Sequence, residues 1–177
     1  MSEEKKETWL GYVATSTILF AVCATLSTFK GGQHSTRAVL SQSKATNQWA
    51  YYQSKDLKSY LHELHKDALD LAVLGADKGG GDYAQAVRKK AQAYADKIAK
   101  YDVQKEEIKQ QATAYDNAIA LAQAHSNAFG MAVIFLQISI LLSSVSALMK
   151  MKPVWYGGLA VGAVGVAFFA NGFFLFF

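Results

Sequence analysis

Four histidines are the side chains best suited to bind a metal ion, and they form two candidate pairs. His62 and His65 are three residues apart, a spacing at which two imidazoles on one face of a helix can share a metal ion. Asp96 is the one carboxylate placed to lie across from them, and no third ligand is evident. His34 and His125 form the second pair, and they can approach each other as a pH-sensitive contact or as a metal pair. At positions 62 and 65 we expect exposed polar histidines, and we predict no metal site and no cofactor.

Residue patterns for catalysis are missing from the sequence. No nucleophile motif and no dinucleotide fingerprint appears, and the glycines at 79–81 lack the Lys and the Ser or Thr that complete a phosphate-binding loop. Cys23 is the only cysteine, which excludes an intrachain disulfide, and its apolar surroundings favour a small packing residue. We therefore predict that the protein is not an enzyme.

An aromatic and basic motif, residues 49–58 (WAYYQSKDLK), is the strongest candidate for contact with another protein. Aromatic side chains and cations suit protein interfaces, so Trp49, Tyr52 and Lys55 are our candidate partner-docking residues. The alternative is that the rings pack between helices of the same molecule while the lysines are solvated.

Three segments of the sequence contain no charged residue, 8–29, 126–149 and 153–177. They indicate the elements that position the residues described above. Each exceeds the roughly 20 residues that span the hydrocarbon core of a bilayer. The chain has 1 Pro in 177 residues, which fits an almost wholly helical protein. We predict an all-α integral membrane protein with transmembrane helices at 9–29, 126–149 and 154–177. Residues 1–8 are then a polar N-terminus, and residues 150–153 are a basic turn.

Between the first two membrane helices, residues 30–125 carry most of the charges and predict a long antiparallel coiled-coil hairpin with its tip at 75–82. Its second helix has an apolar seam that alternates steps of four and three residues, which indicates a partner helix along its length. This seam consists of Val87, Ala91, Tyr94, Ile98, Tyr101, Ile108, Ala112, Tyr115, Ile119 and Ala122. The partner seam that we assign to the first helix consists of Ala50, Ser54, Leu57, Leu61, Leu64, Ala68 and Leu71.

Two details of the hairpin follow from glycines and charges. Two glycines, at 31 and 32, allow a bend or a short break between the first membrane helix and the hairpin. Pairing the two helices about the glycine-rich tip places Lys55 near Asp102, and it places Lys105 opposite Tyr52, where a cation–π contact is possible.

Small residues on the last two membrane helices predict where these helices pack in lipid. Small side chains let helix backbones approach closely, and hydroxyls can bridge helices. The predicted packing residues are Ser139, Ser143, Ser146, Gly158, Gly162 and Gly165.

Charge distribution bears on partners and orientation. The formal net charge is +4 and the charges are interspersed, so no nucleic-acid partner is expected. The expected partners are membrane lipid, further copies of the chain and a larger membrane assembly. Lys5, Lys6, Lys150 and Lys152 share one side, which favours a cytoplasmic N-terminus and a periplasmic hairpin. Basic residues after the first membrane helix, among them Arg37, argue for the opposite orientation.

Residues 30–37 (KGGQHSTR) and 44–58 (KATNQWAYYQSKDLK) resemble a bacterial membrane family catalogued as domain of unknown function 4337. Its pattern is a lysine, Ala-Ser, a polar residue and then QWAYYQAKSIK, from which Thr46, Ser54, Asp56 and Leu57 depart mildly. The resemblance extends to the order of one span, a helical insert and two closing spans. It implies a bacterial inner-membrane protein and implies no activity.

The regular seams, the spare aromatic surface and the lack of a reactive constellation predict a non-enzymatic homo-oligomeric scaffold, or an accessory subunit that braces a larger membrane assembly. One alternative is an oligomeric channel or small-solute pore lined by polar residues of the spans. A second alternative is a membrane sensor with a ligand-binding hairpin.

Overall fold

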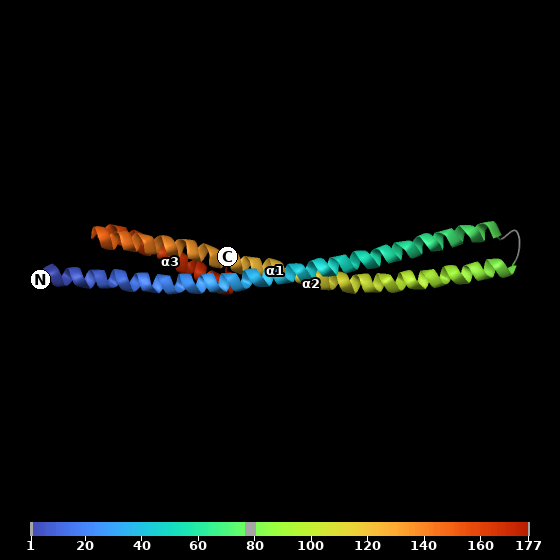
Figure 1. Cartoon of the computed structure of the whole chain (residues 1–177), viewed down its shortest axis with the longest axis horizontal. Coiled ribbons are helices and arrows are strands. Elements are labelled where there is room, and N and C mark those ends of the chain that lie inside the picture. The colour runs from blue at the N-terminus through green and yellow to red at the C-terminus, as the bar shows by residue number, and fades with distance from the viewer. Residues whose placement is uncertain (1, 77–80, 177) are drawn as a thin grey trace. The chain divides into compact units, whose positions relative to one another are not determined.

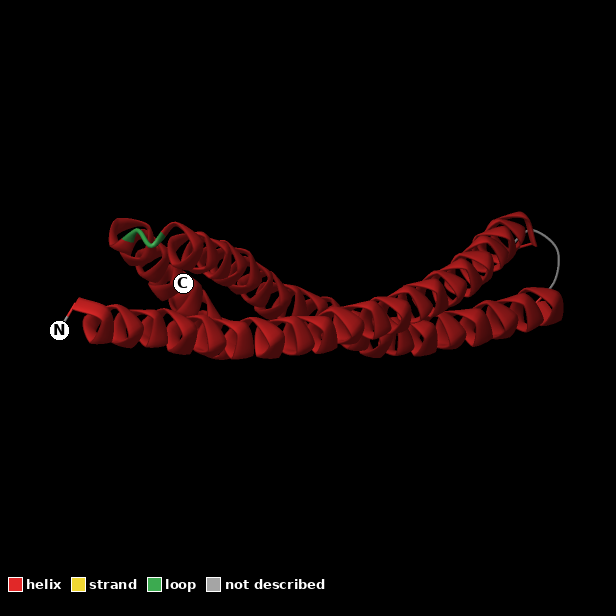
Figure 2. Cartoon of the chain, turned by 60° about the vertical axis from the view of Figure 1, so that its left-hand side comes forward, coloured by secondary structure: helices red, strands yellow, loops and turns green. Residues whose placement is uncertain are grey.

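The chain is described by a computed structural model over residues 2–76 and 81–176, and this part of the chain folds into three α-helices (Figures 1 and 2). Helix α1 is Ser2–Ala76, α2 is Gly81–Met149 and α3 is Lys152–Phe174. No strand occurs in the described ranges, so the prediction of an all-helical protein is confirmed. The predicted tip at 75–82 falls in large part on residues 77–80, which lie outside the described residues.

Helix α1 continues through Gly31 and Gly32, so the short break that these glycines allow does not occur. A Cβ atom at Gly31 would lie 3.2 Å from the Cβ of Phe129. The hydroxyl of Ser126 donates a hydrogen bond to the carbonyl of Gly31 at 3.2 Å. The missing side chain at position 31 therefore permits a close approach of α1 and α2, and packing against α2 stabilises the helix despite the glycine's low helix propensity.

A short turn joins α2 to α3. Lys150 has φ 53°, and Met151 precedes the first residue of α3. The hydroxyl of Ser146 donates to the carbonyl of Met151 at 2.8 Å, which connects the end of α2 to the start of α3. Pro153 lies in the first turn of α3, where its missing N–H breaks no helical hydrogen bond. Helix α3 ends at Phe174, after which Leu175 has φ 50° and its N–H donates to the carbonyl of Asn171.

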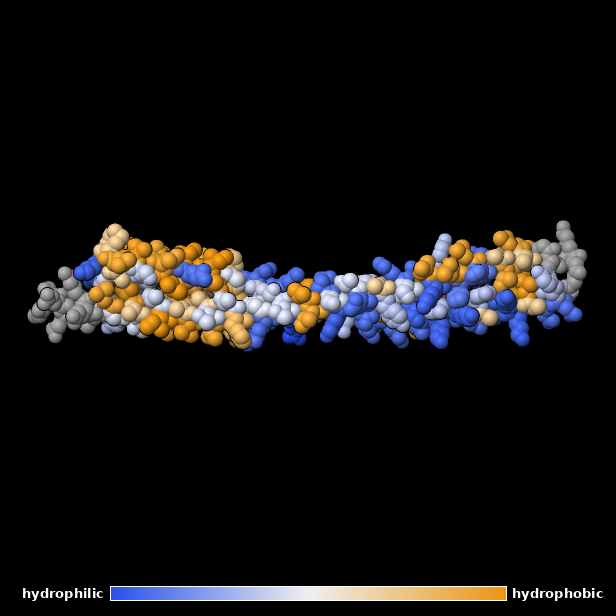
Figure 3. Space-filling model, in the orientation of Figure 1, coloured by the Kyte–Doolittle hydropathy of each residue, from blue (hydrophilic) through white to orange (hydrophobic). Residues whose placement is uncertain are grey.

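The helices divide into two compact units, and each is described by itself. The first unit consists of Met1–Leu40 and Ala118–Phe177, and the second of Ser41–Asn117. On the face drawn in Figure 3, hydrophobic residues dominate the first unit and hydrophilic residues dominate the second. All three helices are long and apolar enough to cross a membrane by length and composition.

In the first unit, small residues and phenylalanines form the core. Ala24, Ala132 and Leu136 are buried, and the partly buried residues packed against them are Phe20, Cys23, Phe168 and Phe169. Phe129 has no exposed surface, and its ring lies 5.1 Å from that of Phe173 and 6.3 Å from that of Phe169. The core therefore draws on α1, α2 and α3 together.

In the second unit, α1 and α2 lie against each other, and later residues of α1 contact earlier residues of α2. Lys44 lies over the ring of Tyr115, and His65 stacks on Tyr94. The face of α2 that contacts α1 is the predicted seam. Every residue of that seam is buried or half-buried.

The seam predicted on α1 is wrong. All seven of its residues are exposed, whereas Ala45 and Ser59 are buried on the opposite side of the helix. The cause is the tyrosines of α2, whose broad rings contact cations and imidazoles of α1 in place of leucines. Tyr101 is the clearest case, since it contacts both Lys55 and His62.

Candidate functional site

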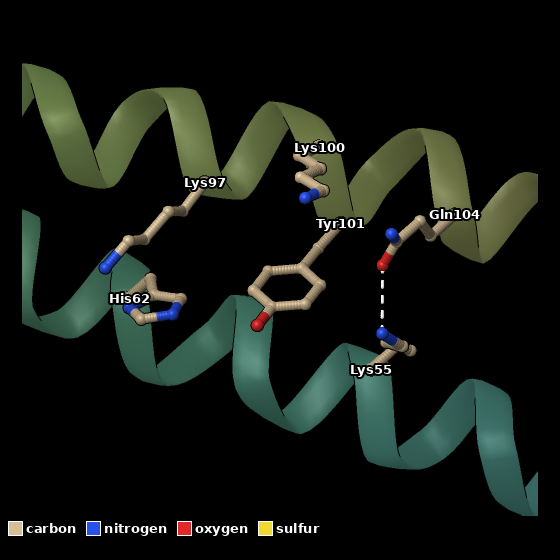
Figure 4. A pocket seen from close by; sticks show the side chains of 6 residues that line it. All are labelled: Lys55, His62, Lys97, Lys100, Tyr101 and Gln104. Carbon is tan, nitrogen blue, oxygen red and sulfur yellow. Dashed lines mark hydrogen bonds between the residues drawn. The ribbon is translucent and has the colours of Figure 1, made fainter.

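A cavity of about 280 Å³ lies in the second unit between α1 and α2 (Figure 4). Helix α1 supplies two of the lining residues and α2 supplies four. They are Lys55, His62, Lys97, Lys100, Tyr101 and Gln104. Residue patterns do not predict this cavity, because Lys97 and Lys100 belong to no recognisable motif and only the pairing of the helices brings them near Lys55.

The ring of Tyr101 lies between the two helices and organises this cavity (Figure 4). The ammonium group of Lys55 lies 5.3 Å from the centroid of that ring and donates a hydrogen bond to Oε1 of Gln104 at 2.9 Å. His62 stacks on Tyr101 with centroids 5.6 Å apart and planes 13° from parallel. Cation–π contacts and the amide thus hold the lysine in place without a carboxylate.

Charge defines what the cavity can bind. Its lining includes three lysines and no acidic residue. The Nδ1 atom of His62 is buried and has no hydrogen-bond partner within the described part of the chain. A buried polar atom without a partner costs free energy that a bound ligand or water recovers. The arrangement suits a small anion.

The predicted docking residues Trp49, Tyr52 and Lys55 are half-buried where α1 meets α2. The indole N–H of Trp49 donates to Oδ2 of Asp116 at 3.1 Å, and its ring lies edge-on to that of Tyr52. The polar atoms of Trp49 and Lys55 thus have partners within the chain.

Lys105 differs from its predicted environment. It was expected opposite Tyr52, but its ammonium group lies 2.9 Å from Oδ1 of Asp102 and 3.0 Å from Oδ1 of Asp56. The hydrogen bonds that this ammonium group donates to the two carboxylates raise the pKa of Lys105 above its ordinary value. Lys55, which was predicted near Asp102, bonds Gln104 instead. The pairing of the helices is therefore shifted slightly from the predicted one.

The candidate metal pair on α1 contacts an aromatic ring. The rings of His62 and His65 lie 5.4 Å and 5.7 Å from that of Tyr94. Asp96 accepts a hydrogen bond from Gln92 on its own helix. Among the residues that the structure describes, no group of three potential ligands could hold a metal ion.

His34 and His125 approach each other in the first unit, as predicted. Their rings are stacked, with centroids 4.6 Å apart and planes 23° from parallel. Nδ1 of His125 lies 2.8 Å from the carbonyl oxygen of Gly172 in the last turn of α3. Nothing in the spacing of residues indicates that α3 reaches this pair, since no spacing rule relates Gly172 to His125.

The six small residues proposed for packing are all buried in the first unit. The hydroxyl of Ser139 donates to the carbonyl of Gly158 at 2.7 Å. A Cβ atom at Gly162 would lie 2.7 Å from the hydroxyl of Ser139, and one at Gly165 would lie 3.0 Å from the backbone nitrogen of Leu136. These residues lie where α2 and α3 meet.

The described part of the chain is all-helical, and each of its three helices contains a segment long and apolar enough to cross a membrane by length and composition. The remaining parts of α1 and α2 form a polar two-helix unit. A family model described as domain of unknown function (DUF4337) matches residues 9–175, and the chain belongs to this family. No curated protein and no solved structure matches the chain.

Proposed function

We propose that the protein is a non-enzymatic, homo-oligomeric membrane scaffold, or an accessory subunit that braces a larger membrane assembly. In this proposal the first unit spans the bilayer with three segments. The second unit is an antiparallel coiled-coil hairpin outside it, and copies join through the hairpin.

Exposed apolar side chains of the first unit support the membrane insertion. Ile18, Leu19, Leu141 and Leu148 are between 61% and 83% exposed, on segments without charged residues. Burying such side chains in hydrocarbon is favourable, whereas leaving them in water is not.

The observation that carries the oligomer proposal is the leucine face, which we define as Leu57, Leu61, Leu64 and Leu71 on α1. These side chains are 60%, 46%, 48% and 69% exposed. Their spacing continues the alternating steps of four and three that are typical of a helix–helix seam. Since residues of a helix rotate by about 100° each, this face lies opposite the side that contacts α2. Helix α1 therefore has a second seam, and α2 does not cover it.

The occupant that best fits the leucine face is the leucine face of another copy. Lys58 and His65 follow one edge of the face, and Asp67 follows the other. Copies inserted in one membrane with the same topology point the same way. In a parallel pair, the edge of one helix that carries Lys58 and His65 faces the edge of its partner that carries Asp67. Basic residues therefore do not face basic residues, and acidic residues do not face acidic residues.

The test is the mass of the full chain in mild detergent, measured by native mass spectrometry. We expect a multiple of the 19.3 kDa chain mass. Replacing Leu57, Leu61 and Leu64 with Gln removes the apolar seam, so this variant should be a monomer with unchanged helix content by circular dichroism.

A matched control replaces three apolar residues outside the leucine face that are at least as exposed, Val39, Leu40 and Val103, with Gln. This control should keep the mass of the parent protein. A monomeric parent, or equal dissociation of both triple variants, would refute the oligomer.

The membrane-sensor alternative is favoured by the lysine-lined cavity of the second unit, which suits an anionic ligand. Inorganic phosphate, titrated while the resonances of His62 are followed by NMR, tests it. A sensor requires a shift that saturates and that is lost in Lys100→Gln. For the channel alternative, Ser139 and Asn171 would have to line an open axis, whereas both are buried within one chain.

A further inference from the structure

A second cavity, of about 100 Å³, lies in the first unit between α1 and α2. We call it the foot cavity. Its polar lining is His34, Arg37 and His125, and its apolar lining is Ala118, Leu121 and Ala122. Its volume accommodates one small ionic group.

The two imidazoles are held in a fixed arrangement at the foot cavity. His34 stacks on His125 and also lies 6.0 Å from the ring of Phe129. Because the carbonyl of Gly172 can only accept a hydrogen bond, Nδ1 of His125 carries the proton in that contact. Its Nε2 atom is then left for another partner.

Positive charge around the foot cavity has no acidic counterpart. Arg37 and Lys30 lie close enough to His34 to affect its titration electrostatically. The sequence contains no Asp or Glu at residues 8–55 or 117–177, so none stands near Arg37 on α1 or near His125 on α2, and none occurs in α3. Within the described residues, the guanidinium of Arg37 forms no ion pair. A bound anion would supply the missing negative charge.

The positive charges around the foot cavity also affect the pKa of His34. Burial is the largest cause that lowers the pKa of His34, followed by the charges of His125, Arg37 and Lys30. The groups that face His34 are His125, Arg37 and Lys30, together with the carbonyl of Gly172 near His125. The negative charge of a phosphate in the cavity would act against these effects and favour the protonated imidazole of His34.

We propose that the foot cavity binds the phosphate group of an anionic membrane lipid, held by Arg37 and the two histidines, with Lys30 close by. Lys30 directly follows the apolar segment 8–29, and His125 directly precedes the segment 126–149. Phe29 and Leu121 are 62% and 57% exposed and offer apolar surface for the acyl chains. Guanidinium and ammonium groups are the usual phosphate ligands in proteins. The proposal that the bound phosphate belongs to a lipid depends on the membrane insertion proposed above, but it does not depend on oligomer formation.

The experiment uses the full chain in mild detergent with three probes: short-chain phosphatidylglycerol, short-chain phosphatidylcholine and inorganic phosphate. Native mass spectrometry counts bound lipid, and NMR follows the imidazole resonances of His34. We expect saturable binding of phosphatidylglycerol, about tenfold weaker in Arg37→Gln because one charge-assisted contact is lost. Lys89→Gln, which removes an exposed charge of the second unit, should bind as the parent does.

Three outcomes decide the proposal. Selective loss in Arg37→Gln with a rise of the His34 pKa on binding supports it. Equal binding by Arg37→Gln and Lys89→Gln overturns the site. Inorganic phosphate that binds as tightly as phosphatidylglycerol overturns the lipid assignment. The same spectra report the oligomer mass, so a failure of the scaffold proposal is seen separately.

Discussion

His34 is a partly buried imidazole in a positive field, and its pKa lies below the ordinary value of histidine. We expect Arg37→Gln to raise this pKa, since removing a nearby cation makes protonation less costly. NMR titration of the His34 ring in detergent, without added lipid, measures the change. Lys89→Gln serves as the charge-matched control, and an unchanged pKa in Arg37→Gln would show that Arg37 does not contribute to the field.

The same depressed pKa has a consequence for stability. Between the folded-state pKa of His34 and its ordinary value, the unfolded chain binds more protons than the folded chain. The free energy of unfolding should therefore fall as the pH falls through that window. In His34→Gln this part of the pH dependence should disappear, which thermal unfolding at a series of pH values in detergent can measure. A pH profile identical to that of the parent protein would contradict the assignment.

Lys105 contributes to stability through its contacts with Asp56 and Asp102, whose side chains are 58% and 54% exposed. Exposed ion pairs are worth less than about 1 kcal/mol, so Lys105→Gln should destabilise the second unit only slightly. The effect should shrink at high salt. Chemical unfolding at low and high salt tests this, with the exposed Lys109→Gln as control. Equal losses in both variants would mean that the ion pairs contribute nothing specific.

Among the elements, α3 depends on its glycines for contact with α2. A Cβ atom at Gly165 would meet the backbone nitrogen of Leu136 at 3.0 Å, and backbone cannot move aside as a side-chain end can. We expect Gly165→Ala to destabilise the first unit by about 1–3 kcal/mol. Gly157→Ala is the matched control on the same helix, because nothing lies within 4 Å of its Cβ position. Thermal unfolding in detergent compares the two, and equal melting temperatures would exclude the close contact.

The two long helices show what the sequence could predict and what it could not. Helix α2 has one apolar stripe through the second unit, so the stripe identified its buried face. Helix α1 has two faces with the same periodicity, and leucine content alone predicts the wrong one as the inner face. The actual inner face includes Ala45, Ser59 and His62, which are identifiable only once the tyrosines of α2 are placed opposite.

Only some contacts of the candidate sites could be predicted from the sequence, because only some follow from the order of the helices. His34 and His125 flank the two apolar segments, so their meeting followed from the order of the helices. Arg37 and Gly172 were missed, because an exposed arginine and a glycine in an apolar helix have many ordinary explanations. The lysine-lined cavity depends on which turn of α1 faces which turn of α2, and sequence spacing fixes that pairing only to within about one turn.

For the whole molecule, the leucine face predicts contact between equivalent residues of neighbouring copies. In a chain with Cys23→Ser, the further substitution Leu61→Cys leaves one cysteine per chain. On mild oxidation in the membrane, this cysteine should form a disulfide with the same residue of a second copy. Electrophoresis without reductant would then show a dimer. Val103→Cys, at a position on α2 that is 63% exposed against 46% for Leu61, should stay monomeric under the same conditions. Equal cross-linking at both positions would indicate random collision.

The foot cavity exists only where α1 and α2 come together, because both helices supply its lining. Ser126 is bonded to Gly31 of α1, and its neighbour His125 is bonded to Gly172 of α3. An occupant of the cavity binds the assembled helices and not the separated ones, so it shifts the equilibrium toward assembly. The heat tolerance of this protein should thus vary with the headgroup composition of its bilayer, and extraction into neutral detergent should shorten its lifetime.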